Sequence, residues 1–384
     1  MSLETDNLVD YNRFNLVEFK NVLLQIEAKA AETEHDADGP VAEFNLLRNA
    51  GALELVLPGR PLDFNEPNTP ALLQILKDVG KANLSVGRIY EGHINTLYLI
   101  HLYATTAQRE KWFSGVAENG DVFGIWNTQD QNGINFIDQE DGFEIRGCKT
   151  FCSGATLVTK ALITGNIKTA DRDGWQMAII DMDKILPTQI DKESWQPLGM
   201  KASGSYTVNF SGYHLQEQSL LGLPGIYLKQ PYFNGGAIRF AAVQLGGAEA
   251  IAEQTINYLK YLNRTDDPFQ QLRLSSIMSA VISGRLWLEQ AGRNYDAWAN
   301  EGNHDEDLIA FANMTRVNIE EICLQVMDNS NRCVGARGLM ETGNLGRLFR
   351  DLTFYLRQPA PDATRLNVAK FFINNPSTFH EQYL

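Results

Sequence analysis

Two short segments carry side chains that could hold a flat aromatic ligand. WNT (126–128) and FCS (151–153) each combine an aromatic ring with neighbouring polar groups, on or beside a predicted strand. A flat aromatic ligand needs this combination, because its polar edge requires hydrogen-bonding groups and its face requires a flat apolar wall. The residues alone also allow a second interpretation, in which Trp126 and Phe151 are core of the sheet and the polar groups cap strand ends.

The segment RDLTFYLRQPAPDATR (350–365) offers a candidate catalytic acid. Asp362 is the first carboxylate after Asp351, and Pro359 and Pro361 restrict the backbone before it. A carboxylate in a dry pocket can abstract a proton from a substrate. An aspartate at this place also suits the start of a helix, PDATRLNVAKFF, and the sequence favours this second role.

Three zones of different texture must position these segments. Residues 1–119 are predicted to be helical, because 15–32 carries apolar residues at helical spacing and Thr105 is a suitable N-cap. Residues 120–228 alternate short apolar runs with Gly, Asp and Asn turns, which predicts an antiparallel β-sandwich or barrel. Residues 229–384 return to long amphipathic helices. We therefore predict an α+β fold with an N-terminal α-helical domain, a middle β domain and a C-terminal helical bundle domain.

Composition argues against several functional classes. The 384 residues carry a net charge of −14 at pH 7 with scattered basic residues, which disfavours binding to nucleic acid or to an anionic membrane surface. The chain has no apolar run long enough to span a membrane, and its start lacks the features of a signal peptide. Its four cysteines are not a disulfide framework, and Cys148 and Cys152 lack a nearby histidine for a zinc site. We expect a cytoplasmic globular protein without a metal.

Five segments, in order, resemble the acyl-CoA dehydrogenase superfamily over roughly residues 20–373. They are EHDADGPVAEFNLLRNAGALELVLP (34–58), IHLYATTAQREKWFSGVAENGDVFGIWNTQD (100–130), DGFEIRGCKTFCSGATLVTKALITG (141–165), WQPLGMKASGSYTVNFSGYHL (195–215) and GNLGRLFRDLTFY (343–355). Each is weak alone, but their common order argues against chance. The resemblance implies an acyl-CoA dehydrogenase-like fold whose C-terminal domain is a four-helix bundle.

The resemblance also implies a flavin cofactor, with FAD expected and FMN as the alternative. It would place Trp126, Asn127 and Thr128 near the pyrimidine side of the flavin ring. Phe151 and Ser153 would lie over the other flank of the ring. No GxGxxG follows a strand, so a Rossmann mode of binding is not indicated.

The family holds the diphosphate and adenine of its flavin between two subunits, so the resemblance implies a homodimer or homotetramer. The matching cofactor-contact residues are Arg264, Phe269, Arg332, Gly335 and Ala336. Arg332 stands where the family usually has Gln, and DDP in NRTDDPFQQLRL (263–274) departs from the usual spacing. The residues of CVGARGL (333–339) by themselves also allow an ordinary turn between helices.

The catalytic glutamate of the family is missing from both of its usual places. The resemblance puts one place at Pro359 and the other at Ile238, immediately before Arg239. Gly236 replaces an acidic residue that often helps an acyl-CoA substrate. Abstraction of a proton from a thioester therefore lacks its usual base, since Asp362 stands three residues late and reaches less far than Glu.

Three functions remain open for the chain. The first is an FAD-dependent oxidoreductase acting on a small molecule such as an acyl thioester, with an atypical or missing base. The second is a reduced-flavin-dependent monooxygenase, which needs no base, and FCSGA and ASGS (202–205) look more like those members. The third is a catalytically silent flavin-binding or scaffold protein. We predict His93 and Arg239 as substrate-binding residues, although a histidine within a helix more often belongs to the core.

Overall fold

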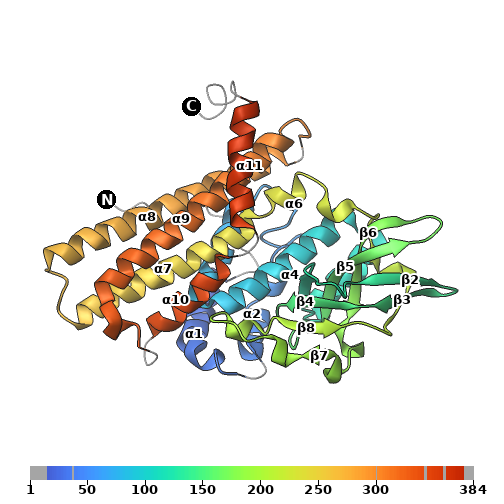
Figure 1. Ribbon diagram of the computed structural model, residues 1–384, viewed down its shortest axis with the longest axis horizontal. Coiled ribbons are helices and arrows are strands. Elements are labelled where there is room, and N and C mark those ends of the chain that lie inside the picture. Colours follow the sequence, from blue (N-terminus) through green and yellow to red (C-terminus); the bar gives the residue numbers. More distant parts are fainter. Residues whose placement is uncertain (1–14, 37–38, 300, 341–343, 358–359, 376–384) are drawn as a thin grey trace.

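The computed structural model describes residues 15–36, 39–299, 301–340, 344–357 and 360–375. The predicted α+β class is confirmed, with helices before and after a strand-bearing region. Figure 1 shows the strands gathered at one end of an elongated molecule and three long helices extending away from them. These three helices are α7 (Ile238–Tyr261), α8 (Pro268–Trp298) and α9 (Asp305–Gly338).

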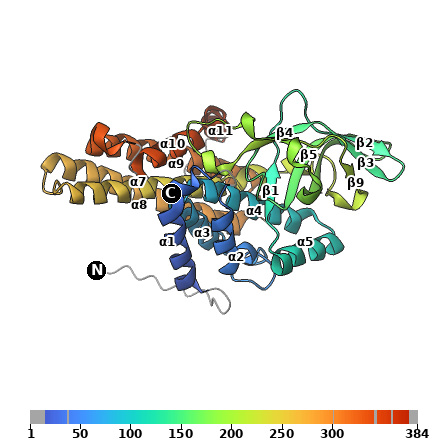
Figure 2. The ribbon, with the colours of Figure 1, turned by 90° about the horizontal axis from the view of Figure 1, so that it is seen from below.

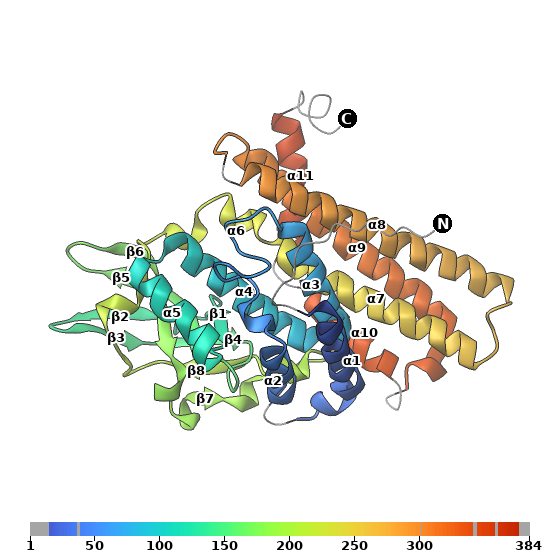
Figure 3. The same cartoon turned by 180° about the vertical axis from the view of Figure 1, so that it is seen from behind.

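Five α-helices precede the strands in the described part of the chain, and most residues of one of them, α4, are buried. Their bounds are α1 (Leu16–Thr33), α2 (Val41–Asn49), α3 (Thr69–Ala82), α4 (Leu84–Tyr103) and α5 (Thr106–Asn119). Asn83 caps α4, because its side-chain oxygen accepts hydrogen bonds from the backbone N–H groups of Ser85 and Val86. The predicted cap at Thr105 is confirmed as a capping box with Gln108. Figure 3 shows α1, α2 and α5 on the face that is turned away in Figure 1.

The strands form two sheets. Their bounds are β1 (Phe123–Trp126), β2 (Asn135–Gln139), β3 (Gly142–Arg146), β4 (Cys148–Cys152), β5 (Lys160–Lys168), β6 (Asp173–Asp181), β7 (Ile190–Asp191), β8 (Tyr206–Asn209), β9 (His214–Leu215) and β10 (Leu220–Leu221). The larger sheet has the order β10-β6-β5-β2-β3-β9 with β1 also paired to β5, and the smaller is β4-β8-β7. Most pairs are antiparallel, but β1 and β2 both run parallel to β5. The alternation of residues did not predict these parallel pairs, because it reports which side of a strand is buried and not the direction of its neighbour. Figure 2 shows α4 and α5 beneath β1 and the strands around it.

Close packing of α3 against α7 joins the N-terminal helices to the C-terminal ones. A Cβ atom on Gly246 would stand 2.1 Å from the backbone oxygen of Lys77, and one on Gly80 would stand 2.5 Å from that of Val243. Only glycine allows the two backbones to approach so closely. Helix α3 also packs on α8, so it forms part of the bundle of α7, α8 and α9.

A largely buried ionic cluster connects α3, α7 and α8. Glu249 of α7 accepts hydrogen bonds from Lys77 of α3 at 2.9 Å and from Arg285 of α8 at 2.7 and 3.0 Å. Lys77 and Glu249 are both almost completely buried. The pKa of Glu249 is lowered, because the hydrogen bonds and charges of Arg285 and Lys77 outweigh the effect of burial. Removing Glu249 would take from the buried Lys77 the partner that it meets inside the bundle.

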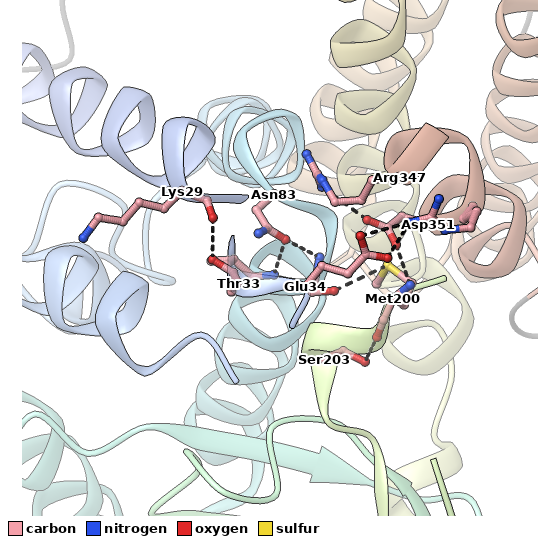
Figure 4. A network of polar contacts seen from close by, with 11 residues as sticks. Lys29, Thr33, Glu34, Asn83, Met200, Ser203, Arg347 and Asp351 are labelled. Carbon is pink, nitrogen blue, oxygen red and sulfur yellow. Dashed lines mark hydrogen bonds and ion pairs between the residues drawn. The ribbon is translucent and has the colours of Figure 1, made fainter. Parts of the chain in front are cut away.

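The RD motif of α10 (Asn344–Tyr355) anchors the loop that precedes β8. Asp351 accepts a hydrogen bond from the backbone N–H of Met200 at 2.6 Å and pairs with Arg347 at 3.3 Å (Figure 4). Met200 has a left-handed backbone with φ of 62°, which is uncommon for a residue with a side chain. The neighbouring Arg350 donates hydrogen bonds to both carboxylate oxygens of Glu34, so α10 also contacts the end of α1.

Three further observations concern the described part of the chain. No helix in these residues is long and apolar enough to cross a membrane. No group of three or more His, Cys, Asp or Glu residues within them is arranged to hold a metal ion. Cys148 and Cys152, at the two ends of β4, are free thiols.

Candidate functional site

A cavity of about 450 Å³ lies where the sheet meets the helices. Its wall is built by β1, the end of β4, one face of α4, the start of α7 with the short α6 (Tyr232–Gly235), and parts of α9 and α10. The lining residues are Arg88, Glu91, Asn95, Tyr98, Leu99, Ile125, Trp126, Asn127, Thr128, Phe151, Ser153, Tyr227, Tyr232, Phe233, Asn234, Gly236, Ala237, Arg239, Phe240, Arg316, Tyr355 and Arg357. Every residue of WNT (126–128) lines it, as do Phe151 and Ser153. The structure therefore brings the two predicted segments to one site.

The Asn127 side chain is held in one orientation by groups beneath the cavity wall. Its Oδ1 atom accepts hydrogen bonds from the Thr164 hydroxyl at 2.7 Å and from the Trp175 indole N–H at 3.1 Å. Lys149 supports both partners, because its ammonium donates to the Thr164 hydroxyl and lies 4.9 Å from the centre of the Trp175 ring. Burial lowers the pKa of Lys149 to about 7. Sequence reasoning missed this lysine, which is fully buried on β4.

Phe151 presents an aromatic ring at the cavity while its backbone is strained. Its φ is 56°, and its side chain is 46% exposed although the residue lies on β4. A left-handed backbone at a bulky residue costs free energy, and such strain gathers at functional sites. The ring meets Trp195 edge to face at 5.7 Å. Trp126 is buried and donates its indole N–H to the carbonyl oxygen of Ser153, which joins the two segments.

One face of α4 supplies the polar part of the opposite wall. Arg88, Glu91, Asn95 and Tyr98 follow one another at intervals of three, four and three, so they lie on one side of the helix. Arg88 donates to Glu91 at 2.8 Å, Asn95 donates to the other oxygen of Glu91, and Arg239 donates to the Asn95 oxygen. Sequence reasoning missed this face. An Arg–Glu pair three residues apart, continued by Asn and Tyr at helical spacing in an otherwise apolar helix, was the available signal.

Arg239 connects these hydrogen-bonded side chains of α4 to a group of aromatic rings. Its guanidinium lies 4.8 Å from the centre of the Tyr98 ring and 5.9 Å from that of Tyr295, and it is 6% exposed. The Tyr295 hydroxyl donates to the Tyr98 hydroxyl at 2.9 Å, which fixes both rings. With Arg316 over the ring of Phe240, the wall carries more arginine than carboxylate. Such a wall favours a ligand with negative charge.

His93, predicted as a substrate contact, is not among the residues that line the cavity. Its Nε2 atom lies 2.8 Å from the Leu53 carbonyl oxygen, and its Nδ1 atom accepts the backbone N–H of Phe123 at 3.0 Å. The carbonyl requires a donor and the amide requires an acceptor, so the ring is the neutral Nε2–H tautomer. The side chain is fully buried, and burial lowers its pKa to about 4. His93 points to a different side of α4 from Arg88 and Glu91 and serves the core.

The positions considered for a catalytic acid supply none at the cavity. Ile238 is buried and is not part of the lining, whereas Gly236 is, and a Cβ atom there would stand 2.3 Å from the Arg239 guanidinium. Asp362 is exposed in the first turn of α11 (Pro361–Asn374), away from the lining and without a capping hydrogen bond. Pro359 lies outside the described residues. Among the residues that the structure describes, Glu91 is the one carboxylate of the lining.

The residues predicted to hold the flavin diphosphate lie at the far end of the bundle. Arg264 pairs with Asp267 in the turn between α7 and α8, and the ring of Phe269 is 70% exposed. The remaining three, Arg332, Gly335 and Ala336, are exposed near the end of α9. A Cβ atom on Gly338 would stand 3.3 Å from the Tyr258 ring, so the ends of α7 and α9 meet. Helix α7 spans roughly 35 Å, so these residues do not reach the cavity of their own chain (Figure 1).

Comparisons with known proteins agree with this architecture. Residues 238–356 match the family "Acyl-CoA dehydrogenase, C-terminal domain". The crystal structure of TdsC from Paenibacillus sp. A11-2 with FMN and indole superimposes with a TM-score of 0.82 at 18% identity, covering 94% of this chain and 96% of that one. The C-terminal part of the chain thus matches this family and the chain as a whole shares the fold of TdsC, so the predicted resemblance to the acyl-CoA dehydrogenase superfamily is confirmed.

Several similar curated proteins are named as monooxygenases, and two of them cover most of the chain. The dibenzothiophene monooxygenase of Mycolicibacterium goodii is 22% identical over 351 residues, which are 82% of this chain and 82% of that protein. The probable FMNH2-dependent monooxygenase SfnC of Pseudomonas putida is 24% identical over 361 residues, which are 85% of this chain and 87% of that one. These identities establish kinship of fold, and the reaction has to be argued from the site.

Proposed function

We propose that this chain is a reduced-flavin-dependent monooxygenase that uses FMN and oxidises a small, largely apolar molecule. The observation that carries the proposal is the cavity itself: it joins a flavin-type platform to a wall without a free carboxylate. This is the second of the three functions that the sequence left open. It has better support from the relatives than oxidation of an acyl thioester with FAD, which the sequence placed first.

The donor set of the cavity suits a flavin ring. Trp126 and Phe151 offer aromatic surface, and Asn127, Thr128 and Ser153 offer polar atoms beside it. The arginine-rich wall suits the negative charge of a flavin phosphate or of a reduced ring. Reduced flavin, when bound, supplies the electrons that activate molecular oxygen. The protein would hold the ring, orient the substrate and keep water from the reacting atoms.

The state of Glu91 argues against proton abstraction from a thioester. A general base must be free to take a proton from a group that it touches. Both oxygens of Glu91 already accept hydrogen bonds, one from Arg88 and one from Asn95. A monooxygenase needs no carboxylate base, so this arrangement does not hinder it.

One feature supports FMN over FAD: the relatives and neighbours whose names mention a flavin mention FMN or FMNH2. Within one chain, the residues predicted to hold the phosphate end of the flavin lie at the other end of the bundle from the cavity, as a site shared between two subunits requires. We propose that a second copy of the chain brings its Arg264 and Phe269 to the phosphate end of the cofactor, in a homodimer or homotetramer.

The test supplies FMN reduced by a separate NADH-dependent flavin reductase together with ¹⁸O₂. The substrate panel begins with indole and dibenzothiophene, and mass spectrometry follows the products. We expect a product that carries one ¹⁸O atom and forms only with reduced FMN. If an acyl-CoA bleaches bound oxidised flavin anaerobically and no compound acquires ¹⁸O, the proposal is refuted. Oxidation of an acyl thioester then becomes the better supported function.

A further inference from the structure

Three serine hydroxyls form a buried chain that ends at the cavity. The Ser203 hydroxyl donates to the Met200 carbonyl oxygen at 2.8 Å and lies 2.8 Å from the Ser205 hydroxyl. The Ser205 hydroxyl lies 2.9 Å from that of Ser153. All three serines are at least nine-tenths buried, and Ser153 alone lines the cavity. We call Ser153, Ser205 and Ser203 the serine relay.

The carbonyl at the end of the relay fixes the direction of every hydrogen bond in it. A carbonyl oxygen only accepts and a hydroxyl has one proton, so the hydroxyl proton of Ser203 is used in the hydrogen bond to Met200. Ser205 must then donate to Ser203, and Ser153 must donate to Ser205. The Ser153 proton therefore points away from the cavity. Only lone pairs remain for a ligand, so Ser153 is an acceptor.

The neighbouring Asn127 has the opposite character. The indole N–H of Trp175 can only donate, so the Asn127 atom that it meets is the amide oxygen. The Thr164 hydroxyl donates to the same oxygen. Among the described residues, no hydrogen-bond partner of the Asn127 amide nitrogen is found, and Asn127 lines the cavity. The platform thus offers one donor, Asn127, and one acceptor, Ser153.

A flavin changes its hydrogen-bonding character at one edge when it is reduced. In the oxidised ring, the adjacent positions O4 and N5 both accept hydrogen bonds. In the reduced ring, O4 still accepts but N5 carries a hydrogen and donates. One donor beside one acceptor matches the reduced edge, whereas the oxidised edge would set two lone pairs of electrons against each other.

We propose that the serine relay makes this cavity select reduced over oxidised flavin, with Ser153 accepting a hydrogen bond from N5–H and Asn127 donating to O4. The inference rests on the proposed function and deepens it, because such an enzyme must take up flavin that another protein has reduced. The relay is held from outside the cavity by Asp351, which fixes the Met200 backbone through its N–H (Figure 4). The RD motif thereby acts on the polarity of the cavity without touching the ligand.

The test compares affinities for FMN and photoreduced FMN, by anaerobic titration of the full-length protein and of three variants. Ser205→Ala and Ser203→Ala each release the Ser153 proton from its fixed direction without changing a lining residue. Ser330→Ala is the matched control, because Ser330 is also a buried serine but lies in α9, outside the relay, and its hydroxyl has no hydrogen-bond partner among the described residues. The spectrum of the bound flavin reports its redox state.

The unaltered protein should bind reduced FMN at least tenfold more tightly than FMN, which raises the midpoint potential of the bound flavin by about 30 mV for a two-electron couple. Each relay variant should lower that ratio about tenfold, mainly by tightening oxidised FMN, and Ser330→Ala should leave it unchanged. An unaltered protein that prefers oxidised FMN overturns the inference, as does a ratio that neither relay variant moves. If the protein binds neither form of FMN, the proposed function is refuted as well. If the protein transfers ¹⁸O but the affinity ratio is the same in the relay variants, only the role of the serine relay is refuted.

Discussion

The buried pair of Asp351 and Arg347 permits a quantitative test of how α10 holds the loop beneath the cavity. The two residues are 3% and 6% exposed, and their charged groups lie 3.3 Å apart. The pKa of Asp351 is raised, because burial outweighs the opposing effects of Arg347 and of the Met200 N–H. The ionised carboxylate therefore loses more free energy on burial than its partners return. Replacing one member of such a pair should cost much stability, whereas replacing both members should cost little.

Single substitutions should accordingly be far more damaging than the double one. Asp351→Asn keeps an oxygen for the Met200 N–H but leaves a buried arginine without its carboxylate, at a cost of about 3–5 kcal/mol. Arg347→Met leaves the carboxylate alone and should cost a similar amount. The double variant removes both charges and should lose only about 0–2 kcal/mol. The coupling free energy of the cycle should thus exceed about 3 kcal/mol.

Equilibrium unfolding in urea at pH 7, followed by circular dichroism and tryptophan fluorescence, measures these differences. Arg293→Ala is the control, since its pair with Glu289 is exposed and should contribute no more than about 1 kcal/mol. If the two single losses simply add in the double variant, the charges do not act as a pair and the reasoning is refuted. A loss below about 1 kcal/mol for Asp351→Asn would equally contradict the role given to the RD motif.

Three further predictions address the histidine, the helix packing and the arginine of the site. Because burial lowers the pKa of His93 to about 4, the unfolded chain binds a proton there between pH 6.5 and 4 while the folded chain does not. The free energy of unfolding should therefore fall by up to about 3 kcal/mol as the pH drops through this window. If the free energy of unfolding of His93→Gln depends on pH as steeply as that of the unaltered protein, the prediction is wrong. Gly246→Ala should destabilise by more than about 3 kcal/mol in thermal melts, whereas Gly92→Ala, whose nearest neighbour would be 3.5 Å away, should change stability by less than about 1 kcal/mol. Arg239→Lys should weaken substrate binding about tenfold in a titration and spare FMN binding, because lysine cannot stack on Tyr98 as a guanidinium does; equal loss of both would show a general collapse of the cavity.

The β part of the site could be read from the sequence because it depends on short-range order. Trp126 and Asn127 end one strand, and Phe151 and Ser153 end another, so their aromatic and polar groups are carried to the same edge. The serine relay could not be read in this way. Ser203 and Ser205 lie fifty residues after Ser153, and only the tertiary contact between the two loops aligns their hydroxyls.

The helical part of the site was missed because residue type was weighed above helical phase. His93 attracted attention as a titratable group, yet it projects from the core side of α4. Arg88, Glu91 and Asn95, one turn apart on another side, form the wall. The spacing of these polar residues carried the information, but a single sequence does not say which face of a fully buried helix meets a cavity and which meets packed side chains.

The missing glutamate of the family and the carboxylate that is present lead to one conclusion about the chemistry. For Glu91 to reach a proton of the substrate, Arg88 and Asn95 would have to release its two oxygens. The ion pair instead fixes Asn95, whose oxygen receives Arg239 and so keeps that guanidinium on Tyr98. In the proposed enzyme, the carboxylate orients the substrate side of the cavity, while Ser153 and Asn127 determine the hydrogen bonding of the flavin side. Among the described residues, no free carboxylate lines the cavity to remove the α-proton of a thioester, and the proposed flavin side matches a ring that arrives already reduced. A reaction that begins with reduced flavin and oxygen satisfies both halves of the cavity, whereas one that begins with oxidised flavin and an acyl thioester satisfies neither.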